Sequence, residues 1–445
     1  MLRVLKQQRL LGDAFWALAG QLVSAVALLA GTRMLTELVS PDIFGQVALL
    51  SGFVALGVAV FSYPFICAGM RMLPECRNQQ QRAALHQAVF GLTARSTALA
   101  IAVLMLGGSV YCYVNDSEIG LYVLTGLLLA VTVRRELGIQ LLIGERRQRG
   151  ASFWQTSDSL LRPLVAIGLV YWAGPNPGAI LLGYIFASVV SNTVWSIVHG
   201  ADSESHSGSQ PRLFARLRGN IWVYALPLIP MEFIFWVNGV GDRYVIGYFL
   251  SAAEVGLYAA SYTIINEAFN RSAMVLLRTF QPAYFQAFAA GNGREAFSIL
   301  KVWLTAVTGL GVIGTGLVMM CKDWVAELLL AQTYHAAVGL MPAIAMGSAL
   351  HALGTALAQP LLAKKNTRAV LKGRLCGAIA AVISLPLLVA VYGLPGAAIA
   401  NPVYFGIEAL VLALLAKPWR EPKDIHFAEI DTLSVDLNPS PVINS

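Results

Sequence analysis

Long apolar runs alternate with short polar segments along the chain. Each run has roughly the 20 residues that a helix needs to cross the hydrocarbon of a bilayer, where lipid offers an unpaired backbone no hydrogen-bond partner. We therefore expect an all-α, polytopic membrane protein with about twelve transmembrane helices. The predicted spans are residues 14–36, 47–68, 88–110, 119–141, 152–173, 178–198, 221–241, 257–279, 298–320, 337–359, 373–392 and 396–416.

Two short patterns recur in the second half of the chain. Residues 40–48 share Ser, Gly and Ala in register with residues 251–259, which lie 211 positions later. Pro-Gly-Ala at 177–179 returns 218 positions later, at 395–397. Internal repeats of this kind recur in secondary transporters. The pattern predicts two six-helix bundles at 1–198 and 221–416, with a polar cytoplasmic linker at 199–220 between them and a polar cytoplasmic tail at 417–445.

Composition excludes a soluble protein. The chain is 57% hydrophobic and 12% charged, with a mean hydropathy of +0.65, whereas a soluble domain has about 25% charged residues. The net charge of +7 would suit a nucleic-acid partner only if it were gathered on one surface.

The basic residues instead follow the loops. Seven alternate segments, from 1–13 to 417–445, hold 20 of the 31 Lys and Arg residues, and the loops between them hold only Arg243 and Lys322. The positive-inside rule places the Lys- and Arg-rich segments in the cytoplasm. We therefore expect both termini in the cytoplasm and no nucleic-acid partner.

No motif in the sequence predicts a metal or a cofactor. The five cysteines are odd in number, scattered and never spaced as C-x-x-C, which favours small packing residues over zinc ligands or disulfides. The pattern G-x-x-x-x-G-K-[ST] does not occur, so we do not expect ATP hydrolysis.

Nine basic residues fall inside the predicted spans, where a charge is costly unless it faces a cavity or a partner. Arg33, Lys301 and Arg374 lie close enough to span ends to reach the interface. The other six are predicted to bind substrate, because guanidinium groups match phosphate oxygens and stay charged on burial; three of them (Arg134, Arg135 and Arg278) also lie near enough to the inner surface to reach it instead. The six are Arg95, Arg134, Arg135, Arg162, Arg271 and Arg278.

Four carboxylates also lie deep in the spans. Asp158 precedes Arg162 by four residues, and Glu267 precedes Arg271 by four, so each pair shares a helix face and can form an ion pair. The other two carboxylates have no basic residue one turn away. A purely structural ion pair is the alternative to a substrate or coupling role for each pair. The predicted coupling or ion-pair carboxylates are Asp158, Glu232, Glu267 and Glu408.

The stretch 238–262 carries a family resemblance. Asp242-Arg243 closes an apolar run, and Gly256-Leu257-Tyr258 opens the next span after a short acidic turn. On Asp242, Arg243, Gly256 and Tyr258 the stretch resembles polysaccharide exporters of the Wzx type. These belong to the multidrug/oligosaccharidyl-lipid/polysaccharide (MOP) superfamily.

The resemblance implies a flippase of the bacterial inner membrane. Wzx-like proteins move undecaprenyl-diphosphate-linked sugar units from the inner to the outer leaflet for the synthesis of surface polysaccharides such as O-antigen lipopolysaccharide and exopolysaccharide, and Arg-lined cavities occur in the superfamily. It implies alternating access, a lipid-linked oligosaccharide as substrate, the lipid bilayer as surroundings, and polysaccharide polymerase and chain-length proteins as candidate partners.

Two other functions fit the same pattern of spans. An efflux pump of the same superfamily would carry another amphiphile, although a pump for amphiphilic cations should have an acidic cavity. A membrane polysaccharide polymerase or ligase would be an enzyme, and such enzymes resemble this chain in span number but carry a large outer loop with a catalytic Arg or His. The longest outer loop predicted here is 321–336, and His335 is its only histidine. We therefore predict a transporter rather than an enzyme.

Overall fold

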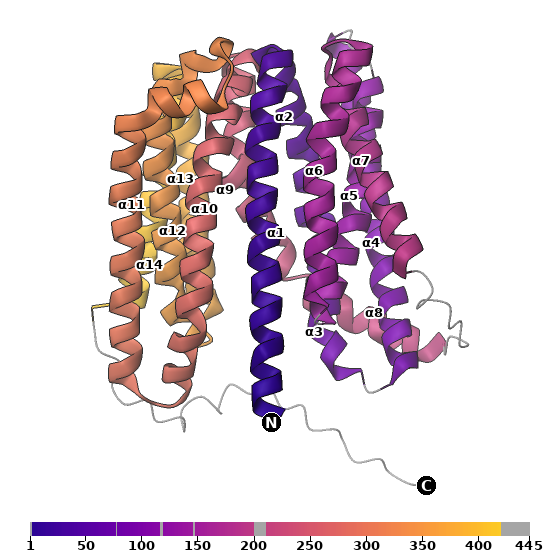
Figure 1. Ribbon diagram of the computed structural model, residues 1–445, viewed down its shortest axis with the longest axis vertical. Coiled ribbons are helices and arrows are strands. Elements are labelled where there is room, and N and C mark those ends of the chain that lie inside the picture. The colour runs from indigo at the N-terminus through magenta and orange to yellow at the C-terminus, as the bar shows by residue number, and fades with distance from the viewer. Residues whose placement is uncertain (1, 77, 116–118, 146, 200–210, 420–445) are drawn as a thin grey trace.

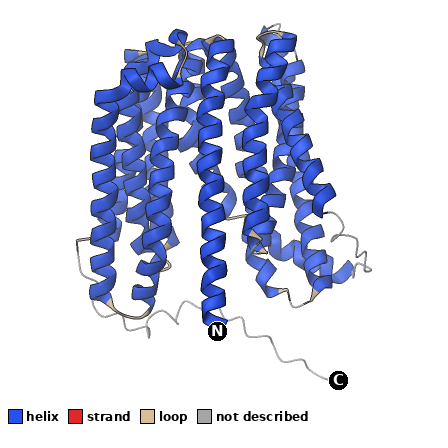
Figure 2. Cartoon of the chain, in the orientation of Figure 1, coloured by secondary structure: helices blue, strands red, loops and turns tan. Residues whose placement is uncertain are grey.

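The computed structural model describes residues 2–76, 78–115, 119–145, 147–199 and 211–419, and these form helices joined by short turns (Figure 2). Two short helices, η1 (Gly57–Ser62, a π-helix) and η4 (Gln332–Leu340, a 3-10 helix), precede α3 and α12. The α-helices are α1 (Leu2–Leu38), α2 (Pro41–Leu56), α3 (Tyr63–Met72), α4 (Gln79–Asn115), α5 (Gly120–Gly144), α6 (Gln148–Ala173), α7 (Pro177–His199), α8 (Pro211–Ala225), α9 (Leu228–Phe249), α10 (Ala252–Ala289), α11 (Gly293–Leu329), α12 (Met341–Ala363), α13 (Thr367–Tyr392) and α14 (Leu394–Ala416).

The helices form two lobes (Figure 1). The first lobe contains α1–α7 and has a core that includes Leu129 and Ile180. The second contains α9–α14 and has a core that includes Tyr258 and Ile344. The predicted spans lie on helices of the described chain, and the all-α, polytopic fold is confirmed.

Some helices carry too many charged residues to count as apolar membrane spans. Seven helical segments of the described chain are long and apolar enough to cross a membrane, or eight if the bent pair of α8 and α9 counts as one span. The helices that fall short include α5, α6 and α10, each of which carries charged residues along its length. These helices also supply most of the buried ion pairs described below.

Proline bends the span formed by α8 and α9. Proline lacks a backbone N–H, and its ring clashes with the preceding turn of a helix. Accordingly α8 ends at Ala225, two residues before Pro227, and α9 starts at Leu228 after a bend of 45°. A second irregularity lies in the second span, where Pro64 follows the π-helical turn η1, a feature that commonly marks a kink.

The extent and packing of α8 differ from the predicted division between linker and second bundle. The sequence places 211–220 in the linker and 221 onward in the second bundle, but the whole segment folds as α8 and packs on the first lobe. Its Ile221 is buried in a cluster with Phe65 of α3 and Leu85 of α4. Phe214 and Leu217 line the same face because they lie seven and four residues before Ile221.

Parts of the predicted linker and tail lie outside the described residues. They are residues 200–210 of the linker and 420–445 of the tail.

The lobes meet closely where α2 crosses α10. This crossing lies at the end of the bundle that α1 reaches at Leu38, which we call the upper end (Figure 1). A Cβ atom built on Gly45 of α2 would overlap the Ala252 carbonyl and lie 2.8 Å from the Gly256 nitrogen. A Cβ on Gly256 would in turn overlap the Pro41 carbonyl. Only glycine allows the two backbones this approach, and the two glycines hold the same place in the predicted repeat.

Hydrogen bonds extend this contact between the lobes. Each joins a side chain to a backbone group of the other lobe, and on the first lobe all of them involve residues 36–52. They are Ala331 N to Thr36 Oγ1 at 3.2 Å, Tyr334 Oη to the Val39 carbonyl at 3.0 Å, Tyr244 Oη to the Leu49 carbonyl at 2.8 Å, and Trp236 Nε1 to the Gly52 carbonyl at 2.9 Å. The lobes are therefore joined from the upper end down α2.

Candidate functional site

Three charged side chains meet inside the first lobe. Asp158 and Arg162 lie one turn apart on α6, and Arg162 Nε is 2.8 Å from Asp158 Oδ2. Arg135 of α5 donates to the same oxygen. The Asp158 side chain is 0% exposed, whereas those of Arg162 and Arg135 are 24% and 17% exposed. The accessible part of this cluster, which we call the arginine cluster, therefore belongs to the two arginine side chains.

Two hydroxyl groups fix the arginine cluster in place. Ser188 of α7 donates to Asp158 Oδ1 at 3.0 Å and accepts from Arg162 Nη2 at 2.9 Å. Thr132 of α5 accepts from the same Nη2 at 3.3 Å. Arg162 thus ties α5, α6 and α7 together, while Arg135 Nε is buried without a hydrogen-bond partner among the described residues.

One further carboxylate lies beside the arginine cluster. Glu136 Oε2 is 3.8 Å from Arg135 Nη2, a longer contact than the pairs with Asp158. Its other oxygen accepts from Gln140 Nε2 at 2.8 Å. Glu136 therefore offsets part of the positive charge but does not close off Arg135.

The second lobe holds its own buried ion pair. Arg374 of α13 donates to Glu408 of α14, whose side chain is 0% exposed. Arg374 Nη2 also donates to Thr355 Oγ1 of α12 at 3.3 Å, and its guanidinium lies 5.3 Å from the ring centre of Phe235. Asn238 of α9 donates to the other oxygen of Glu408 at 3.5 Å. The charge of Glu408 is therefore matched by Arg374 and shielded by the helices around it.

The two ion pairs share one kind of contact. In each lobe an arginine on the fifth span donates to a threonine on the fourth: Arg162 to Thr132, and Arg374 to Thr355. The first lobe adds a second arginine, Arg135, whereas no second arginine pairs with Glu408 in the part of the chain that the structure describes.

A third ion pair touches the boundary between the lobes. On α10, Arg271 Nε donates to Glu267 Oε1 at 2.7 Å. Its Nη1 donates to the Gln21 carbonyl of α1 at 2.9 Å. Arg271 therefore links the second lobe to the first helix of the chain.

The motif residues of 238–262 form a packed polar core in the second lobe. Tyr258 Oη donates to Asp242 Oδ2 at 2.7 Å, and the Arg243 backbone N–H donates to Asp242 Oδ1 at 2.8 Å. Asn401 of α14 donates to Tyr258 Oη at 3.4 Å. The Arg243 guanidinium lies 5.9 Å from the ring centre of Tyr262. With Gly256 at the crossing of the lobes, all four motif residues thus have a packing role.

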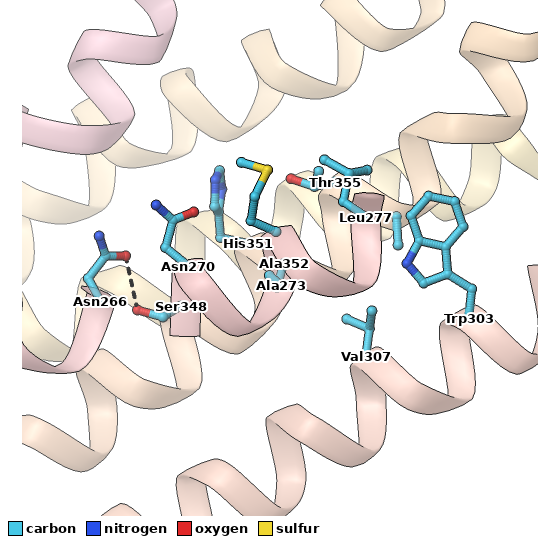
Figure 3. A pocket seen from close by; sticks show the side chains of 12 residues that line it. Asn266, Asn270, Ala273, Leu277, Trp303, Val307, Ser348, His351, Ala352 and Thr355 are labelled. Carbon is cyan, nitrogen blue, oxygen red and sulfur yellow. Dashed lines mark hydrogen bonds between the residues drawn. The ribbon is translucent and has the colours of Figure 1, made fainter. Parts of the chain in front are cut away.

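A small cavity lies between α10, α11 and α12. Figure 3 shows Asn266, Asn270, Ser348, His351 and Thr355 along it, with Trp303 and Val307 of α11 on another side. Its volume is about 50 Å³, which is room for roughly three to five water molecules.

Comparison with known proteins relies on structure, because no protein-family model and no curated protein sequence matches the chain. A multidrug resistance MATE family transporter of the MOP superfamily, in an inward-facing conformation, superposes with a TM-score of 0.67 at 11% identity, over 94% of this chain and 96% of that one. The lipid II flippase MurJ, in an inward closed conformation, gives 0.65 at 12% identity, over 92% and 87%. A point mutant of the Vibrio cholerae MATE transporter VcmN gives 0.61 at 12% identity, over 92% and 96%.

The chain has a MATE- and MurJ-like transporter fold. The likeness covers nearly its whole length. At such low identity the structural likeness shows the fold alone and does not identify the substrate.

Within this MATE-like fold, two predicted ion pairs are present. Asp158 pairs with Arg162, and Glu267 pairs with Arg271. The structure also adds Arg135 to the first pair, which the sequence could not show. Their roles toward a substrate stay predictions.

The remaining predicted substrate residues are not gathered with the arginine cluster. Arg95, Arg134 and Arg278 are exposed, and the Arg134 guanidinium lies 5.5 Å from the ring centre of Phe90. Glu232 is half-buried near the start of α9 and makes no hydrogen bond or ion pair with the described residues.

The expectation for Arg374 was wrong, and Glu408 has a partner that its own helix does not supply. The sequence places Arg374 close enough to a span end to reach the interface, but its side chain is buried against Glu408 in the second lobe. The positions are 34 residues apart on neighbouring helices, and only the packing of α13 on α14 brings them together.

Sequence reasoning also missed the polar cavity. Its signal was present, since Asn266 and Asn270 lie one turn apart on α10 and Ser348, His351 and Thr355 follow one face of α12. Uncharged polar residues in a membrane helix are expected to face a partner or a cavity rather than lipid.

Proposed function

We propose that the chain is a flippase for lipid-linked oligosaccharides, which it moves from the inner to the outer leaflet by alternating access. The observation that carries the proposal is the arginine cluster. The two arginine side chains are partly exposed while the carboxylate between them is buried, so an anion that enters meets the arginines first. Guanidinium groups bind phosphate oxygens in pairs, which suits the diphosphate of undecaprenyl-diphosphate-linked sugars.

The arrangement of the lobes supports the same proposal. Most of the hydrogen bonds between them lie at the upper end and down α2, and the bond from Arg271 to the Gln21 carbonyl of α1 lies lower. With the orientation predicted from basic loops, the upper end faces away from the cytoplasm. A protein closed there would take its substrate from the inner leaflet, in line with the inward-facing state of the MATE transporter structure.

Deletion of the gene tests the biological role. We expect lipid-linked repeat units to accumulate in the inner leaflet and surface polysaccharide to be lost. Normal surface polysaccharide in a strain without a redundant flippase would refute the proposal.

A reconstituted assay tests the arginine cluster itself. In liposomes carrying undecaprenyl-diphosphate-linked oligosaccharide, R135Q should slow flipping by about tenfold or more, since a hydrogen bond to a charged group contributes about 1.5–3 kcal/mol. The variant leaves Asp158 paired with Arg162, so folding should be kept. K301Q, which alters an exposed lysine lying 4.2 Å from the ring centre of Phe297, is the control and should flip at the wild-type rate.

An efflux pump is the second candidate. It is favoured by the MATE transporters with which the fold is shared and by half-buried Glu232, which no arginine neutralises among the described residues. Such a pump would protect cells from amphiphilic cations and would not depend on lipid-linked sugars. Protection by the wild type together with an unchanged flipping rate in R135Q would favour this function over the flippase.

A further inference from the structure

The cavity in the second lobe has a chemistry unlike that of the arginine cluster. Among the described residues that line it none is a carboxylate, a lysine or an arginine. Its polar groups are the amides of Asn266 and Asn270, the hydroxyls of Ser348 and Thr355, the imidazole of His351 and the indole N–H of Trp303. Amide and hydroxyl groups both donate and accept hydrogen bonds. Such a lining matches neutral hydroxyl groups rather than a phosphate or an ammonium group.

Several of these polar atoms have donor or acceptor capacity to spare. His351 Nδ1 is buried without a hydrogen-bond partner among the described residues. Asn266 meets Ser348 only at 3.5 Å, and the Asn270 side chain is exposed beside the cavity. Buried polar groups are usually paired, so the unpaired atoms of this cavity can bind a ligand that forms hydrogen bonds.

Another side of the cavity is largely apolar. Trp303 and Val307 of α11 form it, and the indole N–H of Trp303 is its one polar group among the described residues (Figure 3). A sugar likewise has a polar and an apolar part, since its hydroxyls lie at the ring edge and its C–H groups form apolar faces. The cavity of about 50 Å³ is too small for a whole hexose but admits its hydroxyl edge, which would displace the few waters that fit there.

We propose that this cavity is a subsite for the sugar hydroxyls of the lipid-linked oligosaccharide. The first lobe then takes the diphosphate through the arginine cluster, and the second lobe takes the first sugars through neutral side chains. This subsite rests on the proposed flippase function. It gives the two lobes separate parts of one substrate, so that both must be near it for full affinity.

The test compares two probes with purified protein in nanodiscs. One probe is undecaprenyl diphosphate without sugar, and the other is the lipid-linked oligosaccharide extracted from the deletion strain. N270L removes an exposed amide at similar size, and A273F fills the cavity from α10. Each should weaken binding of the sugar-bearing probe by about tenfold, the loss expected from about two ordinary hydrogen bonds, and leave binding of the bare diphosphate unchanged.

The control is S272A on the same helix, because Ser272 Oγ bonds its own helix at the Ala268 carbonyl (2.8 Å) and does not line the cavity. Equal losses for both probes, or no loss for the sugar-bearing probe in either variant, would overturn the subsite. Equal affinity of the wild type for the two probes would overturn it as well. If the wild type binds neither probe, the flippase function itself fails, and the two failures are thereby told apart.

Discussion

The contact between Gly45 and Gly256 allows a sharp test of how the lobes close. In G45A the new methyl group would meet three backbone atoms of α10 at less than 3.0 Å. Backbone atoms cannot rotate away as a side chain can, so the two helices must separate. Overpacking of this kind costs about 1–3 kcal/mol. The better helix propensity of alanine, about 0.5–1 kcal/mol, is the same in the closed and the open form and does not offset this cost.

The net effect should be a weaker contact at the upper end. Taking about 2 kcal/mol as the overpacking cost to the closed form, the equilibrium between closed and open upper ends should shift roughly 30-fold toward the open form. G256A should act in the same way. The double variant should cost less than the sum, because the first methyl group already separates the helices that the second would push apart.

Thiol labelling measures this shift. Val39 is 4% exposed, and its carbonyl accepts from Tyr334 across the lobes. V39C in a background with the five native cysteines replaced by serine should be protected from a membrane-impermeant maleimide, and G45A should raise its rate of modification roughly 30-fold.

The matched control is G309A on α11, where a Cβ atom would have no neighbour within 4 Å. This variant should not change the rate and should raise the melting temperature slightly through helix propensity. If G45A leaves V39C as protected as the wild type does, then the crossing of α2 and α10 is not what closes the upper end.

Two further predictions concern polar groups buried in the second lobe. R374A and E408A should each lower the free energy of unfolding by about 3–5 kcal/mol, because each leaves one buried charge unpaired, whereas R374M/E408L should stay within about 1 kcal/mol of the wild type. Thermal unfolding in detergent measures the difference. A double variant as destabilised as the single variants would contradict the prediction. Y258F should cost about 1–3 kcal/mol because buried Asp242 loses its phenol donor, and the control Y262F, which leaves that bond intact, should cost less; equal effects of the two would show that the bond is not important.

Much of the architecture follows from the sequence because long and largely apolar segments fold as helices in a membrane. The repeat was also informative, since its Pro-Gly-Ala copies begin α7 and α14, and the turns before those helices hold Gly174 and Gly393 at φ 84° and 62°. The boundary at α8 was lost because its polar face resembles a linker. Its apolar face is only recognisable once α3 and α4 are there to cover it.

The candidate site was predictable only within single helices. Asp158 and Arg162 are four residues apart, so helical geometry alone pairs them. The pairing of Arg374 with Glu408, the approach of Arg135 to Asp158 and the assembly of the cavity each depend on which faces of neighbouring helices meet. Hydrophobicity does not fix that choice in a membrane, where lipid is as apolar as the packed side chains.

The ion pairs of the two lobes differ in how their charges are balanced. In each lobe one arginine on the fifth span donates to a threonine on the fourth. In the second lobe a buried glutamate balances that arginine, which is itself 9% exposed. In the first lobe Arg135 shares the carboxylate that already balances Arg162, and both arginine side chains remain partly exposed. In the proposed flippase the attraction for an anion would therefore depend on Arg135, whose charge Glu136 offsets only in part.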